Sequence, residues 1–405
     1  MPSQSISDLL LKSALYPKES AALIAQKQRS LAIGLPNEVS LQENRIALTP
    51  DAVGLLVRNG HEVIVEKGAG ERSKFTDNEY SNAGARIVYS HQEVFDANVI
   101  LKIEPLVEEE FEFLKPNQTL ISTLNMPNLE KSYFEKLNQK KVTGIAFELI
   151  QDKVGDFPII RVMSEIAGST VMLIAAEYLS SVHEGRGIIL GGITGVPPTK
   201  VVIIGAGTVG EYAARTALSL GADIKIFDKH LYRLQRLKYA IGQNVYTSII
   251  DSETLLDAIT RADVVIGAMR AEDGIAPMVV TEEMISKMRD NSIVIDVSID
   301  QGGCFETSEM TTHRDPIFKR HGVIHYCVPN IASRVSHTAS ITLSNVFTPF
   351  LLQTGTVGGI EEMIFAKQWF MKGVYCYRGN ITNYGISQKF NLKYRDLALL
   401  IAARF

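Results

Sequence analysis

Residues 200–228, KVVIIGAGTVGEYAARTALSLGADIKIFD, decide the fold of this 405-residue chain. They predict a strand at 201–204, a helix with one apolar face, and a second strand that ends in an acid. Gly205, Gly207 and Gly210 stand between the first strand and the helix in the spacing G-x-G-x-x-G. This pattern is typical of a βαβ unit that binds a dinucleotide. The alternative is a glycine turn that only tightens an ordinary strand–helix unit.

Each glycine has a physical task in the dinucleotide interpretation. Gly205 permits the tight turn, Gly207 lets the backbone approach a pyrophosphate, and Gly210 lets the helix pack closely on the strand. The helix begins near Thr208 and Val209, and its N-terminus offers N–H donors and the positive end of a dipole to the phosphates. Because strand, helix, second strand and acid are all in register, we expect dinucleotide binding.

Two further positions belong to the nucleotide signal. Asp228 stands 18 residues beyond Gly210, where an acid accepts hydrogen bonds from ribose hydroxyls and repels a 2′-phosphate. The sequence therefore favours NAD over NADP, with basic Lys229 as the opposing neighbour. Ala268 lies near the end of the buried strand predicted at 262–269, a strand end that lies over the cofactor in such folds.

The alternation of short apolar strands and helices extends on both sides of this unit. It predicts an α/β protein with two doubly wound parallel-sheet domains of Rossmann-like type, separated by a cleft. A helix over about 164–183 would be shared by both domains. We expect a discontinuous substrate domain of residues 30–160 and 337–405, and a nucleotide domain of residues 161–336.

The two ends of the chain carry weaker signals. Residues 1–29 read as an amphipathic helical extension, which could be an oligomer contact or a frayed arm. Residues beyond 337 are helical in pattern and carry too few strands to fold alone, so we expect them to return to the substrate domain.

Composition excludes several classes of protein. Hydrophobic residues make up 46% and charged residues 21% of the chain, and the net charge of −4 gives no case for nucleic acid or an anionic membrane. Three widely spaced cysteines without a CxxC pair favour a reducing, cytoplasmic location. No apolar stretch is long enough to span a bilayer. His321 and His325 are four residues apart, but the residues between them read as strand, so we expect no metal site.

Residues 298–306, SIDQGGCFE, follow an apolar strand with a carboxylate, an amide and two glycines. A plain turn is one interpretation of this stretch. The other is a ligand site that contains Asp300, because ligands of open α/β sheets bind at the carboxyl ends of strands. The position of the strand in the nucleotide domain favours the site.

The chain resembles the alanine dehydrogenase and pyridine-nucleotide-transhydrogenase family over about residues 30–385. The motifs that carry the resemblance are RIALTP, EKGAGERS, MSEIAG, GGITGV, VVIIGAGTVG, ADVVIGA, and DVSIDQGGCFETS followed by YCVPNIAS. It is most similar to the alanine dehydrogenases, because transhydrogenase subunits tend to have glutamate at the acid of SIDQGG. The resemblance implies NAD-dependent oxidative deamination of L-alanine to pyruvate and ammonium by a homo-oligomer, hexameric or dimeric.

The resemblance also implies substrate-binding residues. The family's carboxylate-binding arginine falls on Arg45 of ENRIALTP, and a planar guanidinium suits a bidentate grip on a carboxylate. A solvated loop arginine is the alternative. The family's lysine pattern, K-V-K-E-P, is shortened here to LKIEP, so Lys102 matches either the substrate lysine or its neighbour. A lysine that only extends its amine to solvent is the competing interpretation.

The chain departs from the family at its acid–base residue. Alanine dehydrogenases have a histidine where LISTLNMPN has Asn125, and an asparagine cannot exchange a proton near neutral pH. Asp300 is then the remaining acid–base candidate, with Asn330 as its neighbour at the cofactor, and Lys102 with a lowered pKa is the alternative base. By resemblance Ser164 and Asn330 would contact the cofactor, although Ser164 could be a helix cap and Asn330 a turn residue.

Two other functions stay open on the sequence alone. The chain could be the soluble NAD(H)-binding subunit of a proton-translocating transhydrogenase, which needs no substrate histidine. It could also be a noncatalytic NAD-binding relative, for which Asn125 and the shortened LKIEP are the evidence. The sequence does not determine which amino acid is used, the size of the oligomer or the role of residues 1–29.

Overall fold

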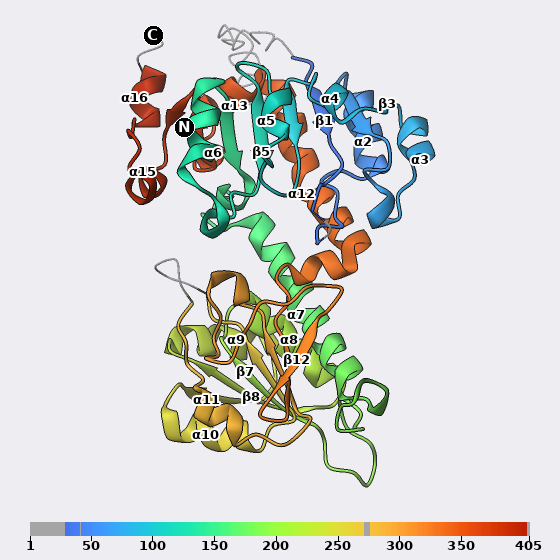
Figure 1. Cartoon of the computed structure of the whole chain (residues 1–405), viewed down its shortest axis with the longest axis vertical. Helices are drawn as coiled ribbons and strands as arrows, with labels where there is room; N and C mark the ends of the chain where they lie inside the picture. Colours follow the sequence, from blue (N-terminus) through green and yellow to red (C-terminus); the bar gives the residue numbers. More distant parts are fainter. Residues whose placement is uncertain (1–28, 41, 271–275, 403–405) are drawn as a thin grey trace, which may run out of the picture.

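The computed structural model describes residues 29–402, apart from residue 41 and residues 271–275. The predicted extension over residues 1–29 therefore falls almost wholly outside the described part. The described residues form two lobes, each built around one sheet with helices on both faces (Figure 1). The predicted α/β class with two doubly wound, mostly parallel sheets is confirmed.

The first lobe contains an eight-stranded sheet in the order β15-β14-β6-β5-β4-β1-β2-β3. Its strands are β1 (Ala32–Leu35), β2 (Glu62–Glu66), β3 (Arg86–Val88), β4 (Val99–Leu101), β5 (Thr119–Ser122), β6 (Thr143–Ala146), β14 (Val374–Tyr377) and β15 (Asn380–Ile381). Its helices are α2 (Pro50–Arg58), α3 (Asp77–Asn82), α4 (His91–Val94), α5 (Glu110–Phe113), α6 (Lys131–Gln139), α13 (Ile360–Ala366), α14 (Gln368–Met371), α15 (Tyr384–Phe390) and α16 (Leu397–Ala402).

The second lobe contains a seven-stranded sheet in the order β12-β13-β11-β10-β7-β8-β9. Its strands are β7 (Lys200–Ile204), β8 (Asp223–Asp228), β9 (Tyr246–Ile249), β10 (Val264–Gly267), β11 (Ile293–Asp296), β12 (Ile317–Arg320) and β13 (Val323–Tyr326). Its helices are α8 (Thr208–Ser219), α9 (Leu231–Ile241), α10 (Ser252–Thr260) and α11 (Glu282–Ser286).

Strand order places one switch point in each sheet. The first lobe builds β1, β2 and β3 outward and then returns to place β4 on the other side of β1, parallel to it. The second lobe does the same with β7, β8, β9 and then β10. Ligands of such sheets bind in the crevice where the order reverses, at the carboxyl ends of the strands. The strands are apolar on both sides: Val264 and Ile266 of β10 face one core and Val265 faces the other.

Two long helices connect the lobes, α7 (Pro158–Leu179) and α12 (Ser336–Val357) (Figure 1). Helix α7 begins six residues before the predicted start at residue 164, because Pro158 fits the first helical turn. Its Gly168 allows close contact with α8, since a Cβ there would lie 2.4 Å from the Val209 carbonyl oxygen. Of the described helices, only α7 is long and apolar enough to cross a bilayer by length and composition. Much of it is buried in the second lobe.

The structure differs from the expectation for the residues after 337, and it gives Thr49 a contact with α12. Residues after 337 include β14 and β15, which join the first sheet by antiparallel pairing, with β15 at its edge. These short strands carry no clear period-2 signal. Thr49 precedes α2, but its side chain makes no capping bond. Its hydroxyl instead bonds Ser344 of α12 at 3.1 Å, so α12 holds this turn against the first lobe.

Candidate functional site

The glycine loop between β7 and α8 has the geometry of a phosphate cradle. Gly205 has φ +114°, and a Cβ on it would lie 2.3 Å from the Ala268 carbonyl oxygen. A Cβ on Gly210 would lie 1.9 Å from the carbonyl oxygen of Gly205. A Cβ on Gly207, in contrast, would meet no atom within 4 Å. The loop therefore needs glycine for packing at two positions and leaves open space at the third, which fits a dinucleotide pyrophosphate.

The remaining nucleotide residues surround this loop. Thr208 and Val209 form the first turn of α8 and are half-buried. Asp228 is fully buried, and its carboxylate accepts hydrogen bonds from the backbone N–H of Ala206 at 2.7 Å and of His230 at 2.8 Å. Asp228 thus fixes the glycine loop to the end of β8, in addition to any contact that it makes with a ribose.

The SIDQGG stretch forms a braced loop at the end of β11. Asp296 accepts hydrogen bonds from the Cys304 backbone N–H at 2.9 Å and from the Ser308 hydroxyl at 2.6 Å. Asp300 lies in the 3-10 turn at 299–301 and keeps an exposed surface. The surrounding protein, followed by the nearby Asp296 charge, raises the pKa of Asp300. Asp296, which sequence reasoning overlooked, organises the loop that presents Asp300.

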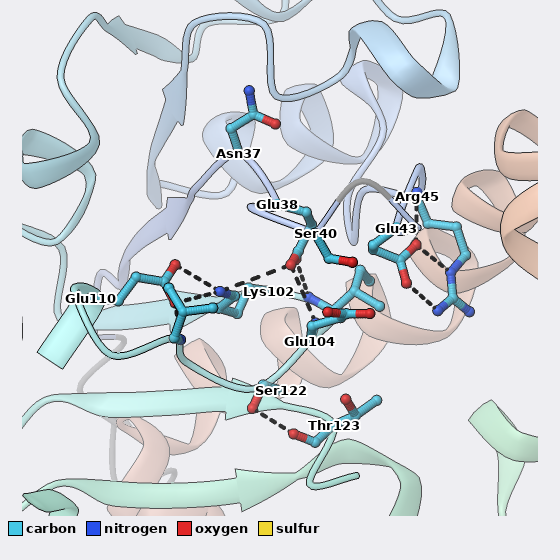
Figure 2. Close-up of polar contacts among 12 residues, drawn as sticks. Asn37, Glu38, Ser40, Glu43, Arg45, Lys102, Glu104, Glu110, Ser122 and Thr123 are labelled. Atoms are coloured by element: carbon cyan, nitrogen blue, oxygen red, sulfur yellow. Dashed lines mark hydrogen bonds and ion pairs between the residues drawn. The ribbon is translucent and has the colours of Figure 1, made fainter. Parts of the chain in front are cut away.

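Arg45 lies where the two lobes meet. Its Nε and Nη2 donate hydrogen bonds to the two oxygens of Glu43, at 2.8 Å and 2.6 Å (Figure 2). The amide of Asn330 donates to Glu43 Oε2 at 2.7 Å, across the lobes. Arg45 Nη1 lies 3.4 Å from Met163 Sδ on α7, one residue before half-buried Ser164. The structure thus brings together Arg45, Asn330 and the Ser164 turn, which were predicted separately.

Glu43 is the residue that sequence reasoning missed here. Its side chain is fully buried and that of Arg45 is 10% exposed, so the alternative of a solvated loop arginine is wrong. Burial alone would raise the pKa of Glu43, but the charge and hydrogen bonds of Arg45 lower it below the ordinary value. The signal that was available is the spacing of the two residues in ENR.

Lys102 follows β4 at the switch point of the first sheet. Its Nζ donates to both oxygens of Glu110 on α5, each at 2.7 Å, and lies 3.9 Å from Glu38 Oε2 (Figure 2). Lys102 is only 2% exposed, so it does not extend its amine to solvent. Glu38 follows β1 and accepts a hydrogen bond from the Ile103 backbone N–H at 2.5 Å. Burial raises the pKa of Glu38 to about 7.

Asn125 follows β5, the strand next to β4. It has φ +38° and an exposed side chain. The preceding backbone N–H, that of Leu124, donates to Glu148 Oε1 at 2.6 Å, while Glu148 Oε2 is buried without a partner. Burial raises the pKa of Glu148 to about 7. This carboxyl group, which the sequence did not single out, holds the turn that presents Asn125.

His313 is a further group between the lobes that the sequence did not reveal. Its backbone N–H donates to the Gln42 side chain of the first lobe at 2.9 Å, and its Nε2 is buried without a hydrogen-bond partner. Burial lowers its pKa, and the charges of Glu43 and Arg45 also act on it. His321 and His325 do not form a pair: His325 is buried on Thr307, and His321 contacts Glu282 at the surface.

Two findings concern the rest of the described chain. Among the described residues, no group of three or more His, Cys, Asp or Glu side chains is arranged to hold a metal ion. A cavity of about 510 Å³ lies at the amino ends of β1, β4 and β5, the sheet edge opposite Lys102 and Arg45. It is therefore separate from the candidate site.

These features define a two-domain, nucleotide-dependent dehydrogenase class: one switch point carries a glycine cradle, and the other carries buried cations. The family described as "Alanine dehydrogenase/PNT" matches almost the whole described chain, with its N-terminal domain on residues 34–167 and its C-terminal domain on residues 171–384. The chain belongs to this family, as its motifs indicated.

Known proteins agree with this assignment. Alanine dehydrogenase 2 of Staphylococcus aureus (strain USA300) is 38% identical over 368 residues, which cover 91% of this chain and 98% of the relative. A solved L-alanine dehydrogenase superposes with a TM-score of 0.84 at 32% identity, covering 89% of this chain and 99% of that one. A transhydrogenase from Sinorhizobium meliloti superposes with a TM-score of 0.75 at 23% identity, covering 87% and 99%, and shows the same fold.

Proposed function

We propose that the protein catalyses NAD-dependent oxidative deamination of L-alanine to pyruvate and ammonium. The observation that carries the proposal is the position of Arg45 between the two switch points, in contact with the nucleotide lobe through Glu43 and Asn330. The alanine dehydrogenases at 38% and 32% identity support the same reaction.

The hydrogen bonds of Arg45 leave one edge of the guanidinium for a substrate. Glu43 engages Nε and one N–H of Nη2. Nη1 donates one N–H to Met163 Sδ at 3.4 Å. The other N–H of Nη1 and the second N–H of Nη2 remain, and this edge has the spacing to bind a carboxylate bidentately. Glu43 holds the arginine in place. Truncating either partner of such a buried pair would leave the other as an uncompensated charge.

Lys102 provides a second cation near the same crevice. An ammonium group has three donors, and Glu110 engages two of them. The third N–H can donate to the carbonyl oxygen of pyruvate. During hydrolysis of the imine, it can donate to the oxygen that water adds to the carbon that carries the nitrogen. Asn125 can add a neutral hydrogen bond, and Asp300 is a candidate to move a proton at the nucleotide side.

NAD would be held by the Gly205–Gly210 loop, Asp228, Ala268 and Asn330, and would supply a hydride acceptor. Its fit rests on the open space at Gly207. An acid at position 228 favours NAD over NADP. We also expect a cytoplasmic homo-oligomer, with residues 30–160 and 337–405 as the substrate domain and residues 161–336 as the nucleotide domain.

The test is formation of NADH from L-alanine and NAD⁺ at alkaline pH, followed by the absorbance of NADH. We expect turnover with L-alanine that needs Arg45. Tight NAD binding without turnover of any small amino acid would contradict the proposal and favour a noncatalytic NAD-binding protein, as the asparagine at position 125 would then indicate.

A further inference from the structure

A carboxylate without full hydrogen bonding lies at the switch point of the first sheet. Glu38 follows β1 and reaches the loop after β4, where its Oε1 accepts from Ile103 N–H at 2.5 Å. Its Oε2 has only a long contact with Glu104 N–H, at 3.4 Å, and the Lys102 amine at 3.9 Å. The residue is 7% exposed. One oxygen is therefore fixed, and the other is weakly bonded beside a cation.

A chain of charged side chains continues from this oxygen toward solvent. Lys102 connects Glu38 to Glu110, and Glu110 Oε1 lies 3.1 Å from Nε2 of His91 on α4. Nδ1 of His91 lies 2.7 Å from Oε2 of Glu66, at the end of β2. The Lys102 and Glu110 side chains are each 1% exposed, whereas His91 is 24% and Glu66 is 15% exposed. The chain thus runs from the crevice to the surface.

The chemistry of deamination requires a base at this place. The substrate ammonium must lose a proton before its electron pair can form a C=N bond, and Asn125 cannot take it. Three candidates for a base at the substrate are Glu38 in the first lobe and His313 and Asp300 in the second. Geometry favours Glu38, because it lies at the ligand crevice of its own sheet, beside Lys102.

We propose that Glu38 is the general base of the reaction and that His91 positions it through Glu110 and Lys102. This role rests on the proposed function. Glu38 takes a proton from the substrate ammonium: an N–H bond breaks, an O–H bond forms at Oε2, and nitrogen keeps the electron pair. The proton passes to water when the product leaves, which restores the carboxylate.

The electrostatics explain why the distant histidine matters. Hydrogen bonds with Glu110, and then with Glu66, raise the pKa of His91 to about 9, so His91 is a cation at neutral pH. It then balances part of the Glu110 charge, which leaves more of the Lys102 charge to stabilise ionised Glu38. The charged groups around Glu38 are Lys102, Glu43, Arg45, Glu104 and Glu110.

The first test is the pH profile of kcat/KM for L-alanine. In the wild type it should rise through about pH 7 as Glu38 ionises. Glu38→Gln keeps the acceptor for Ile103 N–H; it should lower kcat by about 10²–10⁴-fold and remove this limb. The affinity of the variant for NAD⁺, measured by fluorescence titration, should stay within about twofold of the wild type. A tenfold change would correspond to about 1.4 kcal/mol of binding free energy. Glu38→Asp should recover part of the activity.

The second test concerns positioning. His91→Gln should move the same limb of the pH profile to higher pH, by on the order of one unit. Without the His91 cation, Glu110 neutralises more of the Lys102 charge, and ionised Glu38 is stabilised less. His321→Gln is the matched control, since His321 forms the same kind of pair with Glu282 at the surface; its profile should equal that of the wild type. An infrared difference titration of wild type minus Glu38→Gln should show a carboxyl group that titrates near pH 7. In the presence of His91→Gln, the titration of this carboxyl group should also move to higher pH.

Each outcome is decisive. An active wild type together with a fully active Glu38→Gln variant that keeps its limb would overturn the role of Glu38 alone. Loss of the limb in His313→Gln but not in Glu38→Gln would assign the base to the second lobe. A wild type that is inactive on L-alanine would instead contradict the proposed function, and the base role would fall with it.

Discussion

Buried charges in this site occur in pairs that hold one another in place. Arg45 is bound by Glu43 and Lys102 by Glu110, and all four side chains are at most 10% exposed. Replacing one member leaves its partner as an uncompensated buried charge, which is costly. A conservative exchange in such a pair is therefore informative, because lysine cannot reproduce the planar fork of arginine.

We expect the Arg45→Lys variant to fold but to bind the transition state of the reaction more weakly. The loss in kcat/KM for L-alanine should amount to about 2–4 kcal/mol, or about 30- to 1000-fold. The control is Arg86→Lys, because Arg86 and its partner Glu62 are both about half exposed and such surface pairs contribute little. Steady-state kinetics of both variants would show whether the effect is specific to position 45.

Gly207 offers a second prediction at a single residue. An alanine Cβ at position 207 would meet no protein atom within 4 Å, and the residue has φ −75°. The melting temperature of the Gly207→Ala variant should therefore match that of the wild type. The added methyl group would occupy space that we assign to the pyrophosphate. NAD⁺ affinity should fall at least about tenfold, equivalent to about 1.4 kcal/mol. Gly210→Ala should instead destabilise the fold, and equal NAD⁺ affinity in Gly207→Ala would contradict the cradle.

At the scale of elements, strand ends determine where chemistry occurs. The loops after β1, β4 and β5 carry Glu38, Lys102 and Asn125, and the loop after β11 carries Asp300. Three of these ends are fixed by a buried acid that accepts from a backbone N–H: Glu38 at Ile103, Glu148 at Leu124 and Asp296 at Cys304. These acids hold the turns in one conformation.

Glu148 makes stability depend on pH. Its folded pKa of about 7 exceeds the ordinary value of 4.5, so the folded state binds the proton more tightly than the unfolded state. Its contribution is fully present below about pH 4.5 and is lost as the pH rises through about 7. Glu148→Gln should therefore be more stable than the wild type at pH 8, by up to about 3 kcal/mol.

Thermal unfolding as a function of pH would check this result. The difference between Glu148→Gln and the wild type should shrink as the pH falls from about 8 to about 5. Glu135→Gln on α6, whose side chain is 49% exposed, should show no such trend. A pH-independent difference at position 148 would mean that the carboxyl group is not buried in its neutral form.

Sequence reasoning succeeded where the determinants are local in the chain. The glycine loop, α8 and Asp228 fall within one βαβ unit, so the spacing of residues alone predicted this local geometry. Partners brought together by the fold were not predictable in this way: Glu43 and Asn330 are 287 residues apart, and His91 on α4 contacts Glu66 at the end of β2, 25 residues away in the chain. Strands β14 and β15 were not predicted, because they are short and pair antiparallel.

At the scale of the whole molecule, hydrogen bonds between the lobes fix how the two lobes face each other. The backbone N–H of Asn44 donates to the Ser333 hydroxyl at 2.8 Å, and this hydroxyl donates to the Gln42 carbonyl at 2.8 Å. Helix α12 begins three residues later and returns to the first lobe (Figure 1). The same short segment thus joins the lobes and positions Glu43 and Arg45.

Ser333→Ala should weaken this junction. Two backbone groups would lose a buried partner, which costs about 1–3 kcal/mol in the free energy of unfolding. We expect a lower urea midpoint and a higher KM for L-alanine. Ser219→Ala, an exposed serine at the end of α8 that bonds only the Arg215 carbonyl, should change neither quantity. Unchanged values for Ser333→Ala would show that the lobes are held in register by other contacts.

The most direct measurement is a crystal structure of the protein with NADH and pyruvate bound. We predict that the pyruvate carboxylate accepts hydrogen bonds from Nη1 and Nη2 of Arg45, at about 2.7–2.9 Å, with the pyrophosphate against Gly207. A carboxylate bound away from Arg45, or a guanidinium turned to solvent while NADH occupies the glycine loop, would contradict the account.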